Sequence, residues 1–407
     1  MPIPHFFLLA EADSGAEWES VTLCEGTARY LIKGGKNSYS RFSPGNLMLT
    51  KPLIPPSLEV DIRLHEGLAV ADALPRLETY LLEDGPLVEL SRHPGWMNVL
   101  RQSLGHVPYC LEATEGDRTR GFLALAYVDS WLFGRYLVSL PYLNYGGVIS
   151  DDDTTAQLLI DRAIELADRL GVRRLELRHE HPTVCPRLAH ARTDKSHMRL
   201  DLPATAETLW KGVDGKVRNQ VTKARKNGLT VTWGGHDLLP EFYAVFSRNM
   251  RDLGTPVYPR SLFAAALDQF PGKVELCVVR AGHLAVAGAM LLHGWGVSEV
   301  PSASSLRSHN HTNANMLMYW HMLERSIQRE QDVFDFGRST PGSGPYKFKK
   351  QWGAEPAQAH WQSYLRFGSL EETRPDNPRY GHLISMWKRL PVSLTRFIGP
   401  RIVRGIP

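Results

Sequence analysis

The sequence predicts an α+β protein that contains two similar halves in tandem, and two observations support this. Residues 109–178 and residues 275–338 have the same order of features, namely three strands, a helix and one further strand. In both halves the helix begins at capping residues and carries apolar residues at helical spacing, so that it can lie on a sheet. We therefore expect two mixed, mostly antiparallel sheets flanked by helices. The alternative is a chance echo, since α+β chains often show this order.

The individual elements follow from apolar runs and turn residues. A turn at Gly116 separates the first two strands of the first half, and Gly282 has the same place in the second half. Each half also has an upstream stretch with helical spacing, over residues 96–104 and residues 238–253. Strands are expected over residues 109–113, 122–128, 136–140 and 175–178, and over residues 276–280, 285–292, 297–301 and 333–338.

The composition is that of a globular protein, and 407 residues leave room for two domains. Hydrophobic residues make up 43% and charged residues 22%, and the apolar run at 284–292 is too short to span a bilayer. An apolar run at 6–10 has no cation before it and acidic residues directly after it, which argues against a secretory signal. We expect a cytoplasmic protein.

Cysteine and charge content argue against several functions. The sequence His179-Glu180-His181 has the spacing of a strand end or loop and no apparent third ligand, so no metal is expected. A net charge of +4 is too small to indicate nucleic-acid binding by the whole chain, so any anion must meet local basic clusters. The cysteines are scattered without a C-x-x-C pair, which argues against zinc or a disulfide framework: Cys24, Cys110, Cys185 and Cys277.

Residues 334–353 are the most informative segment. Apolar residues predict a short buried strand that ends at Gly337, and the prolines and glycines of 341–345 predict an irregular loop. Three lysines then alternate with aromatic residues over 346–352, which would anchor the rings and leave at least one ammonium facing a cleft. The alternative is an ordinary ion pair between Asp335 and Arg338 beside solvated lysines.

This segment resembles the signature of the FemAB-type branch of the GNAT acyltransferase superfamily. In that signature a strand ending in Asp-Phe-Gly, here residues 335–337, precedes a loop and then Phe-Lys-x-x-aromatic-Gly, here residues 348–353. The resemblance spans roughly residues 60–365. It is closest to FemAB-like proteins that accompany exosortase and PEP-CTERM gene systems in bacteria making exopolysaccharide. It implies two tandem GNAT-like units, in which a sheet splays open at its middle and admits the acyl donor.

The resemblance and the breaks in pattern suggest a division of the chain. Residues 1–57 fit neither half, and we expect a loosely structured extension there. The remaining parts are a first GNAT-like unit at 58–205, a basic linker helix and strand at 206–235, a second unit at 236–368 and a basic amphipathic tail at 369–407. The tail would dock on the headgroups of the inner membrane surface or pack as a terminal helix.

The linker helix carries five cations and no acid over residues 216–228. A solvated helix face is the ordinary meaning of such a run, whereas beside a cleft it would bind phosphate. Similar basic helices occur at this point in FemAB-like chains. We expect Arg218, Lys223 and Arg225 to face an anionic acceptor, which would be a nucleotide-sugar or a lipid-linked saccharide.

The resemblance also implies the co-substrates. No tightly bound cofactor is expected, and the donor would be acyl-CoA or aminoacyl-tRNA. In a donor-binding GNAT unit the turn before the long helix binds pyrophosphate, but residues 151–153 are aspartates that would repel it. Residues 307–313 are cationic and polar, yet they lack the glycines of the usual coenzyme A loop. FemAB-type proteins use aminoacyl-tRNA, which makes tRNA a candidate partner.

The implied reaction is direct attack of an acceptor amine or hydroxyl on an activated carbonyl held in the second unit. The resemblance gives Lys349 the role of stabilising the oxyanion or leaving phosphate, while Asp335 would orient a cation or accept a proton and Tyr346 would position substrate. A non-catalytic scaffold of polysaccharide or PEP-CTERM assembly remains the alternative. The expected substrate-binding residues, besides the three of the linker helix, are Arg307, Asn315, Tyr319, Phe336, Gly337, Arg338, Lys347 and Trp352.

Overall fold

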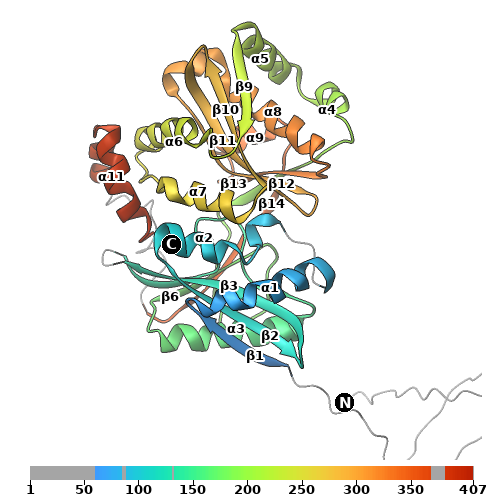
Figure 1. Ribbon diagram of the computed structural model, residues 1–407, viewed down its shortest axis with the longest axis vertical. Coiled ribbons are helices and arrows are strands. Elements are labelled where there is room, and N and C mark those ends of the chain that lie inside the picture. Colours follow the sequence, from blue (N-terminus) through green and yellow to red (C-terminus); the bar gives the residue numbers. More distant parts are fainter. Residues whose placement is uncertain (1–59, 85–88, 131–132, 368–380, 407) are drawn as a thin grey trace, which may run out of the picture. The chain divides into compact units, whose positions relative to one another are not determined.

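The computed structural model describes residues 60–84, 89–130, 133–367 and 381–406 (Figure 1). The chain separates into Met1–Ser57 and Leu58–Pro407, and the description below concerns the second part. The predicted loose extension at 1–57, Cys24 within it, and residues 369–380 of the predicted tail lie outside the described residues.

The first sheet has the strand order β1-β2-β3-β4-β6-β15-β7, with β5 beside β3. Side chains alternate along β3, so that Phe122 and Ala124 enter one hydrophobic core while Leu123 and Leu125 enter another. Helix α3 (Asp153–Arg169) covers one face, and α1 (Ala69–Thr79) and α2 (Trp96–Leu104) cover the other. The strands are β1 Asp61–Glu66, β2 Val107–Glu115, β3 Arg118–Ser130, β4 Gly134–Val138, β5 Ile149–Ser150, β6 Arg174–His179, β7 His190–Arg192 and β15 His360–Leu365.

The second sheet has the order β14-β8-β13-β12-β11-β10-β9. Helices α6 (Leu239–Leu253) and α7 (Arg260–Gln269) pack on one face, and α5 (Gly215–Lys226) and α8 (Ala314–Gln328) on the other. Between β13 and β14 the chain forms the short helix α9 (Gly344–Lys350). The short helix α4 (Ala206–Gly212) precedes α5. The strands are β8 Ser196–Asp201, β9 Leu229–Gly234, β10 Val274–Ala281, β11 Leu284–Gly294, β12 Val297–Ser305, β13 Val333–Ser339 and β14 Glu355–Gln358.

The predicted α+β class and the predicted repeat are confirmed. Each of the eight expected strands overlaps an observed one, from β2, β3, β4 and β6 in the first half to β10, β11, β12 and β13 in the second. In each half one strand pair is parallel, namely β4 with β6 and β12 with β13, and the long helix α3 or α8 connects its two strands. This arrangement is the split-sheet order that the resemblance implies.

The two halves exchange strands and share a core. Strand β8 belongs to the second sheet although it precedes residue 205, and β15 returns to the first sheet from the carboxyl-terminal side. The proposed division at 58–205 and 236–368 therefore describes chain order, not sheet membership. One hydrophobic core contains residues of α2 from the first half and of α6 and α7 from the second. The halves are thus joined by backbone pairing and by buried apolar surface.

The chain ends in α10 (Gly381–Trp387) and α11 (Val392–Val403). Helix α11 packs against α6, and Gly399 lets it approach Val257 so closely that a β-carbon there would lie 2.9 Å from that side chain. Of the two tail arrangements expected, α11 shows the packed one, with Phe397 still 65% exposed. Within the described residues no helix is both long and apolar enough to cross a membrane.

Candidate functional site

The second sheet opens between β12 and β13. The two strands pair only over Val297–Glu299 and residues 333–335; farther along, β12 pairs with β11 alone and β13 with β8 alone. Strand β13 continues to Ser339, one residue beyond the expected 333–338; Gly337 does not end it, because this glycine adopts a φ of 72° within a β-bulge. We call the opening after residues 299 and 335 the split.

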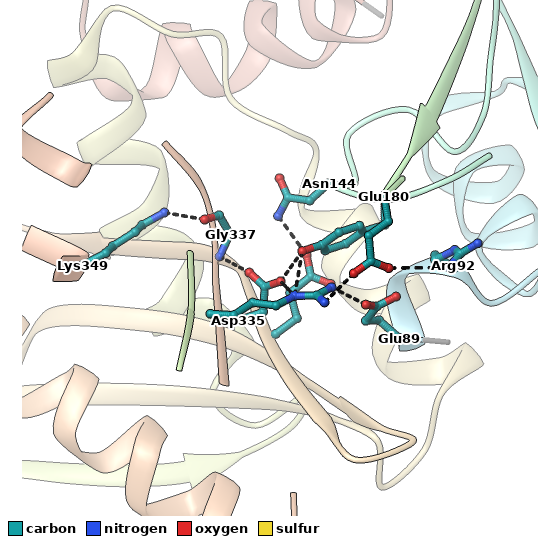
Figure 2. A network of polar contacts seen from close by, with 10 residues as sticks. Glu89, Arg92, Asn144, Glu180, Asp335, Gly337 and Lys349 are labelled. Carbon is teal, nitrogen blue, oxygen red and sulfur yellow. Dashed lines mark hydrogen bonds and ion pairs between the residues drawn. The ribbon is translucent and has the colours of Figure 1, made fainter. Parts of the chain in front are cut away.

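Asp335 lies at the start of the split and is fully buried. Its Oδ1 accepts a hydrogen bond from the backbone N–H of Gly337 at 2.6 Å. Its Oδ2 accepts from the Tyr145 hydroxyl and, at 3.0 Å, from Nε of Arg199 (Figure 2). Burial raises the pKa of Asp335, although Arg199 opposes the shift. Both carboxylate oxygens are thus occupied by donors.

Arg199, from β8, connects the two halves. Besides Asp335 it donates to Glu180 and to Glu89, which come from the first half of the chain. Arg92 lies 3.9 Å from the other oxygen of Glu180. Burial acts to lower the pKa of Arg199, but the surrounding phenol and carboxylates outweigh it and raise that pKa. The guanidinium therefore stays charged and holds three carboxylates together.

Glu299 is the second buried carboxyl of the split and pairs across the strands with Asp335. Burial, with the nearby charge of Asp335, raises the pKa of Glu299 to about 8. Its Oε1 accepts from the Asn144 amide at 2.8 Å, and Ser91 and Asn144 both act to lower its pKa against the effect of burial. Two carboxyls so close favour one shared negative charge, and Glu299 is the one that holds a proton.

Lys349 approaches the split from α9. The predicted alternation over 346–352 is wrong: Pro345 lies in the first turn of a helix, and the Ser343 hydroxyl caps it by accepting from the backbone N–H of Tyr346 at 3.3 Å. The Lys349 ammonium is buried and donates to the backbone carbonyls of Gly337 and Arg338, each at 3.0 Å. Burial lowers the pKa of Lys349 to about 8. Figure 2 shows Lys349 and Asp335 reaching Gly337 from opposite sides.

Arg338 does not pair with Asp335, so the alternative of an ordinary ion pair between them is wrong. Its Nε donates to Asn144 Oδ1 at 3.0 Å, and its guanidinium lies 3.5 Å from the centre of the Trp361 ring. Burial and the neighbouring Arg178 lower the pKa of Arg338 to about 9. The β-bulge explains why Arg338 and Asp335 do not form an ion pair, because it turns the side chain of Arg338 away from Asp335 and toward Trp361 of the first sheet.

Three predicted substrate-binding residues are part of a buried aromatic cluster. The Tyr319 ring stacks on Phe336 at 5.7 Å and meets Phe348 edge-on, and Trp352 lies beside them. All of these rings border the core under α8. The cluster fixes α9 against β13 and thereby sets the position of Lys349.

The remaining predicted residues are dispersed. Helix α5 packs on α8 and β9 through Val217 and Val221, and Figure 1 shows it at the end of the second sheet that is remote from the first sheet. The structure does not bring its cations to the network around Asp335. The positions are α5 for Arg218, Lys223 and Arg225, the turn before α8 for Arg307, the first turn of α8 for Asn315, and α9 for Tyr346 and Lys347.

Sequence reasoning missed the partners of Asp335. Arg199 and Glu299 were detectable in principle, since each lies on a strand next to β13, but strand pairing had to be known first. Tyr145 comes from an irregular loop after β4, where periodicity gives no signal. Glu180 was considered only as a metal ligand, and no cluster of metal-ligating residues occurs in the part of the chain that the structure describes.

Comparison with known proteins agrees with this geometry. Residues 214–350, which include both β12 and β13, match the family model of the acetyltransferase (GNAT) domain. No curated protein matches the sequence significantly. A solved structure titled "Crystal structure of FemX" is similar at 14% identity with a TM-score of 0.56, covering 76% of this chain and 98% of that chain.

A second similar structure is the C-terminal domain of a putative lysylphosphatidylglycerol synthetase from Agrobacterium fabrum. It has 12% identity and a TM-score of 0.50, and the match covers 74% of this chain and 93% of that chain. Likeness at such identities shows the fold alone. Residues 214–350 thus match the acetyltransferase (GNAT) domain model, and they lie within a fold like that of FemX.

Proposed function

We propose that the protein is a FemAB-like acyl- or aminoacyltransferase that modifies a cell-envelope or exopolysaccharide precursor, in the setting of an exosortase and PEP-CTERM system. One observation carries this proposal. The split between β12 and β13 opens beside a buried lysine and two buried carboxyls, within the segment that matches an acetyltransferase domain. Such an opening offers unpaired backbone groups to an extended donor, and the charged groups lie at its closed end.

The proposed reaction is direct transfer. The acceptor amine or hydroxyl attacks the donor carbonyl carbon and forms a C–N or C–O bond, while the bond to the coenzyme A sulfur or the tRNA ribose oxygen breaks. Lys349 uses two of its three N–H groups on backbone carbonyls, so one remains for the developing oxyanion or the leaving group. Tyr346, at the start of α9, positions substrate.

The two buried carboxyls, Asp335 and Glu299, have different roles in this reaction. Asp335 has both oxygens engaged, so it orients Arg199 and Tyr145 and the backbone at Gly337. Glu299 has a pKa of about 8, so its ionised form is the better acceptor for the proton that the attacking amine loses. The departing thiolate or alkoxide then takes up that proton.

The surroundings of the split and the similar structures support a choice of donor and acceptor. The donor is acyl-CoA or aminoacyl-tRNA, taken as a co-substrate; the lysylphosphatidylglycerol synthetase neighbour is named for an aminoacyl product, which supports the latter. The acceptor is an anionic sugar-nucleotide or lipid-linked saccharide. Within the described residues, Arg218, Lys223 and Arg225 of α5 have no acidic partner at ion-pair distance, which leaves them for phosphates together with Arg307.

A peripheral contact with the inner membrane fits the carboxyl-terminal helices. They expose large apolar side chains next to Lys388, Arg389 and Arg401, a combination suited to an anionic lipid surface. The exposed residues are Leu383, Met386, Leu394 and Phe397.

A transfer assay with the full chain tests the proposed function. Labelled acetyl-CoA and charged tRNA are offered with amine-bearing sugar nucleotides, and the wild type is compared with Lys349→Met and Lys350→Met. Loss of one oxyanion donor should cost about 10²–10³-fold in kcat. The exposed Lys350 on the same helix is the matched control and should leave the rate unchanged. Full activity of a folded Lys349→Met variant would contradict the proposal, and absence of transfer by the wild type from either donor would favour the scaffold alternative.

A further inference from the structure

The positive charge of Arg338 is not balanced by a carboxylate partner among the described residues. Its Nε donates to Asn144, its flat face lies 3.5 Å from the centre of the Trp361 ring, and no carboxylate of the described residues lies within ion-pair distance of it. The guanidinium is only partly exposed, so water screens it incompletely. Its two terminal nitrogens remain available as donors in a fork geometry.

The cations around Arg338 do not supply a partner. Arg178 lies 4.0 Å from the centre of the same Trp361 ring, and the nearby Glu176 carboxylate is already shared by Arg174 and Arg178. The Lys349 ammonium donates to the backbone carbonyl of Arg338 itself. The lowered pKa values of Arg338 and Lys349 have burial as their main cause, and repulsion from a neighbouring arginine adds to each. An anion at this place would relieve that repulsion.

His197 provides a second and independent sign of a missing ligand. It is the cross-strand neighbour of Arg338 in β8, is 1% exposed, and stacks on the Tyr145 ring at 4.1 Å. Neither of its ring nitrogens has a hydrogen-bond partner within the described part of the chain. Burial, with Arg338, lowers the pKa of His197 to about 3, so the imidazole is neutral and has one N–H to donate. Leaving such a buried donor unpaired is unfavourable, because it has lost its hydrogen bonds to water without gaining a partner.

We propose that Arg338, His197 and the face of Trp361 form a subsite for one oxyanion, a carboxylate or phosphoryl group of the acceptor. The guanidinium binds two oxygens with its terminal nitrogens, Trp361 holds it flat, and the His197 N–H donates a further hydrogen bond. This subsite lies where β13 and β8 meet the first sheet, and the β-bulge between Asp335 and Arg338 separates it from the start of the split. It deepens the proposed function by naming what fixes the acceptor, but anion binding itself needs no turnover.

Calorimetric titration of the full chain, without any donor, tests the subsite. Inorganic pyrophosphate and succinate serve as phosphoryl and carboxylate probes at constant ionic strength, and the probe that binds identifies the chemistry. Arg338→Met should weaken the binding of that probe at least tenfold. Arg338→Lys should also bind it more weakly than the wild type, because lysine lacks the planar guanidinium with its paired donors. His197→Phe keeps the stack on Tyr145 and removes the donor, so binding should weaken severalfold. Lys350→Met is the matched control and should bind as the wild type does.

Two results would overturn the subsite: neither probe binds the wild type, or the probe binds a folded Arg338→Met variant equally well. If Arg338→Met does not fold, nitrogen NMR of the His197 imidazole in the wild type replaces it. Saturable shifts of that resonance on adding the probe support the subsite, and an unmoved resonance contradicts it. Because no donor is present, failure here leaves the transfer assay unaffected, and failure of transfer leaves this binding unaffected.

Discussion

In the first half, Glu176 of β6 lies opposite Val138 of β4; in the second half, Asp335 of β13 lies opposite Glu299 of β12. The two acidic residues hold equivalent places, since each is the third residue of the later strand of a parallel pair. Glu176 is neutralised by Arg174 and Arg178 of its own strand. Asp335 instead faces a second carboxyl and depends on Arg199 and Tyr145 from other segments.

Two residues farther along each strand, the halves differ again in whether the protein fills the opening between the strands. Arg178 fills the opening of the first half, where its N–H donates to Ser139 Oγ and its side chain to the Leu143 carbonyl. The equivalent residue in the second half is Gly337, which has no side chain. The loop after β4, which closes the opening of the first half, also carries Asn144 and Tyr145 to Glu299 and Asp335 in the second half. The sheet of the first half is therefore closed at this place, whereas the sheet of the second half keeps its split.

The helix starts agree with this division of roles. In the first half the Asp152 carboxylate caps α3 by accepting from the Thr155 N–H at 2.7 Å, so the position is filled by the protein's own anion. In the second half α8 follows Asn313, which has a φ of 59° and no side-chain cap. A negatively charged ligand is thus disfavoured at α3 and compatible with α8.

The largest effect is expected from Arg199→Met, which removes the shared partner of three carboxylates. Since Asp335 and Glu89 are buried, unfolding free energy should fall by about 3–5 kcal/mol in a chemical denaturation experiment. The first-half counterpart Arg174→Met leaves Glu176 its partner Arg178 and should cost clearly less. Equal losses would show that the second half is no more dependent on distant partners than the first.

Gly337→Ala should have the next largest effect. A β-carbon there would lie 3.0 Å from the Asn144 amide, on a backbone with φ of 72°, so both strain and crowding are expected. Gly342→Ala is the matched control, since its φ is 78° but its β-carbon would meet nothing within 4 Å. Denaturation should show a loss of about 2–3 kcal/mol for the first and roughly 1 kcal/mol for the second. A loss no greater at 337 than at 342 would mean that the split is not tightly bordered.

The two halves should also respond oppositely to pH. The pKa of Glu299 is raised to about 8, so between pH 4.5 and 8 the folded protein keeps a proton that the unfolded chain has lost. Stability therefore decreases as pH rises through that window, by at most about 1.4 kcal/mol per pH unit. Glu299→Gln, which mimics the protonated form, should remove this decrease in denaturation curves taken across the window.

Glu176 provides the opposite sign. Burial acts to raise its pKa, but Arg174 and Arg178 outweigh burial and lower it. Its contribution to stability is then present above the pKa of the unfolded chain and is lost as pH falls through the folded value. Glu176→Gln should lower stability at neutral pH and flatten the acid side of the profile. The same pH response for both glutamine variants would contradict the assignment of the two carboxyls.

The smallest effect on stability is expected from α5, which directly precedes β9 in the second half. Replacing Arg218, Lys223 and Arg225 with glutamine should change unfolding free energy by no more than about 0.5 kcal/mol, because the side chains are largely solvent-facing. If α5 binds the acceptor phosphates, KM for the acceptor should rise severalfold while kcat is kept. An unchanged KM would show that these cations form an ordinary solvated face.

Much of the fold was predictable, because strand alternation, helix spacing and turn glycines are local signals. The apolar face of α5 is also predictable from its spacing, and Val217 and Val221 are buried as expected. The site was less predictable. Asp335 and Lys349 stood out in their signature, but Arg199, Glu299 and Tyr145 reach them through strand exchange and an irregular loop, which are properties of the tertiary fold. Helix α9 is not predictable from the run of prolines and glycines before it, because proline usually breaks a helix, whereas Pro345 lies in the first turn, where proline is tolerated.

The most direct test of the split is hydrogen exchange of the full chain with and without saturating acetyl-CoA or charged tRNA. A donor bound between β12 and β13 should slow exchange over residues 300–305 and residues 336–338, where the two strands no longer pair with each other. Residues 138–140, at the closed opening of the first half, should exchange at the same rate in both states. Slowing at 138–140, or none at 300–305 with either donor, would contradict the assignment of the transfer site to the second half.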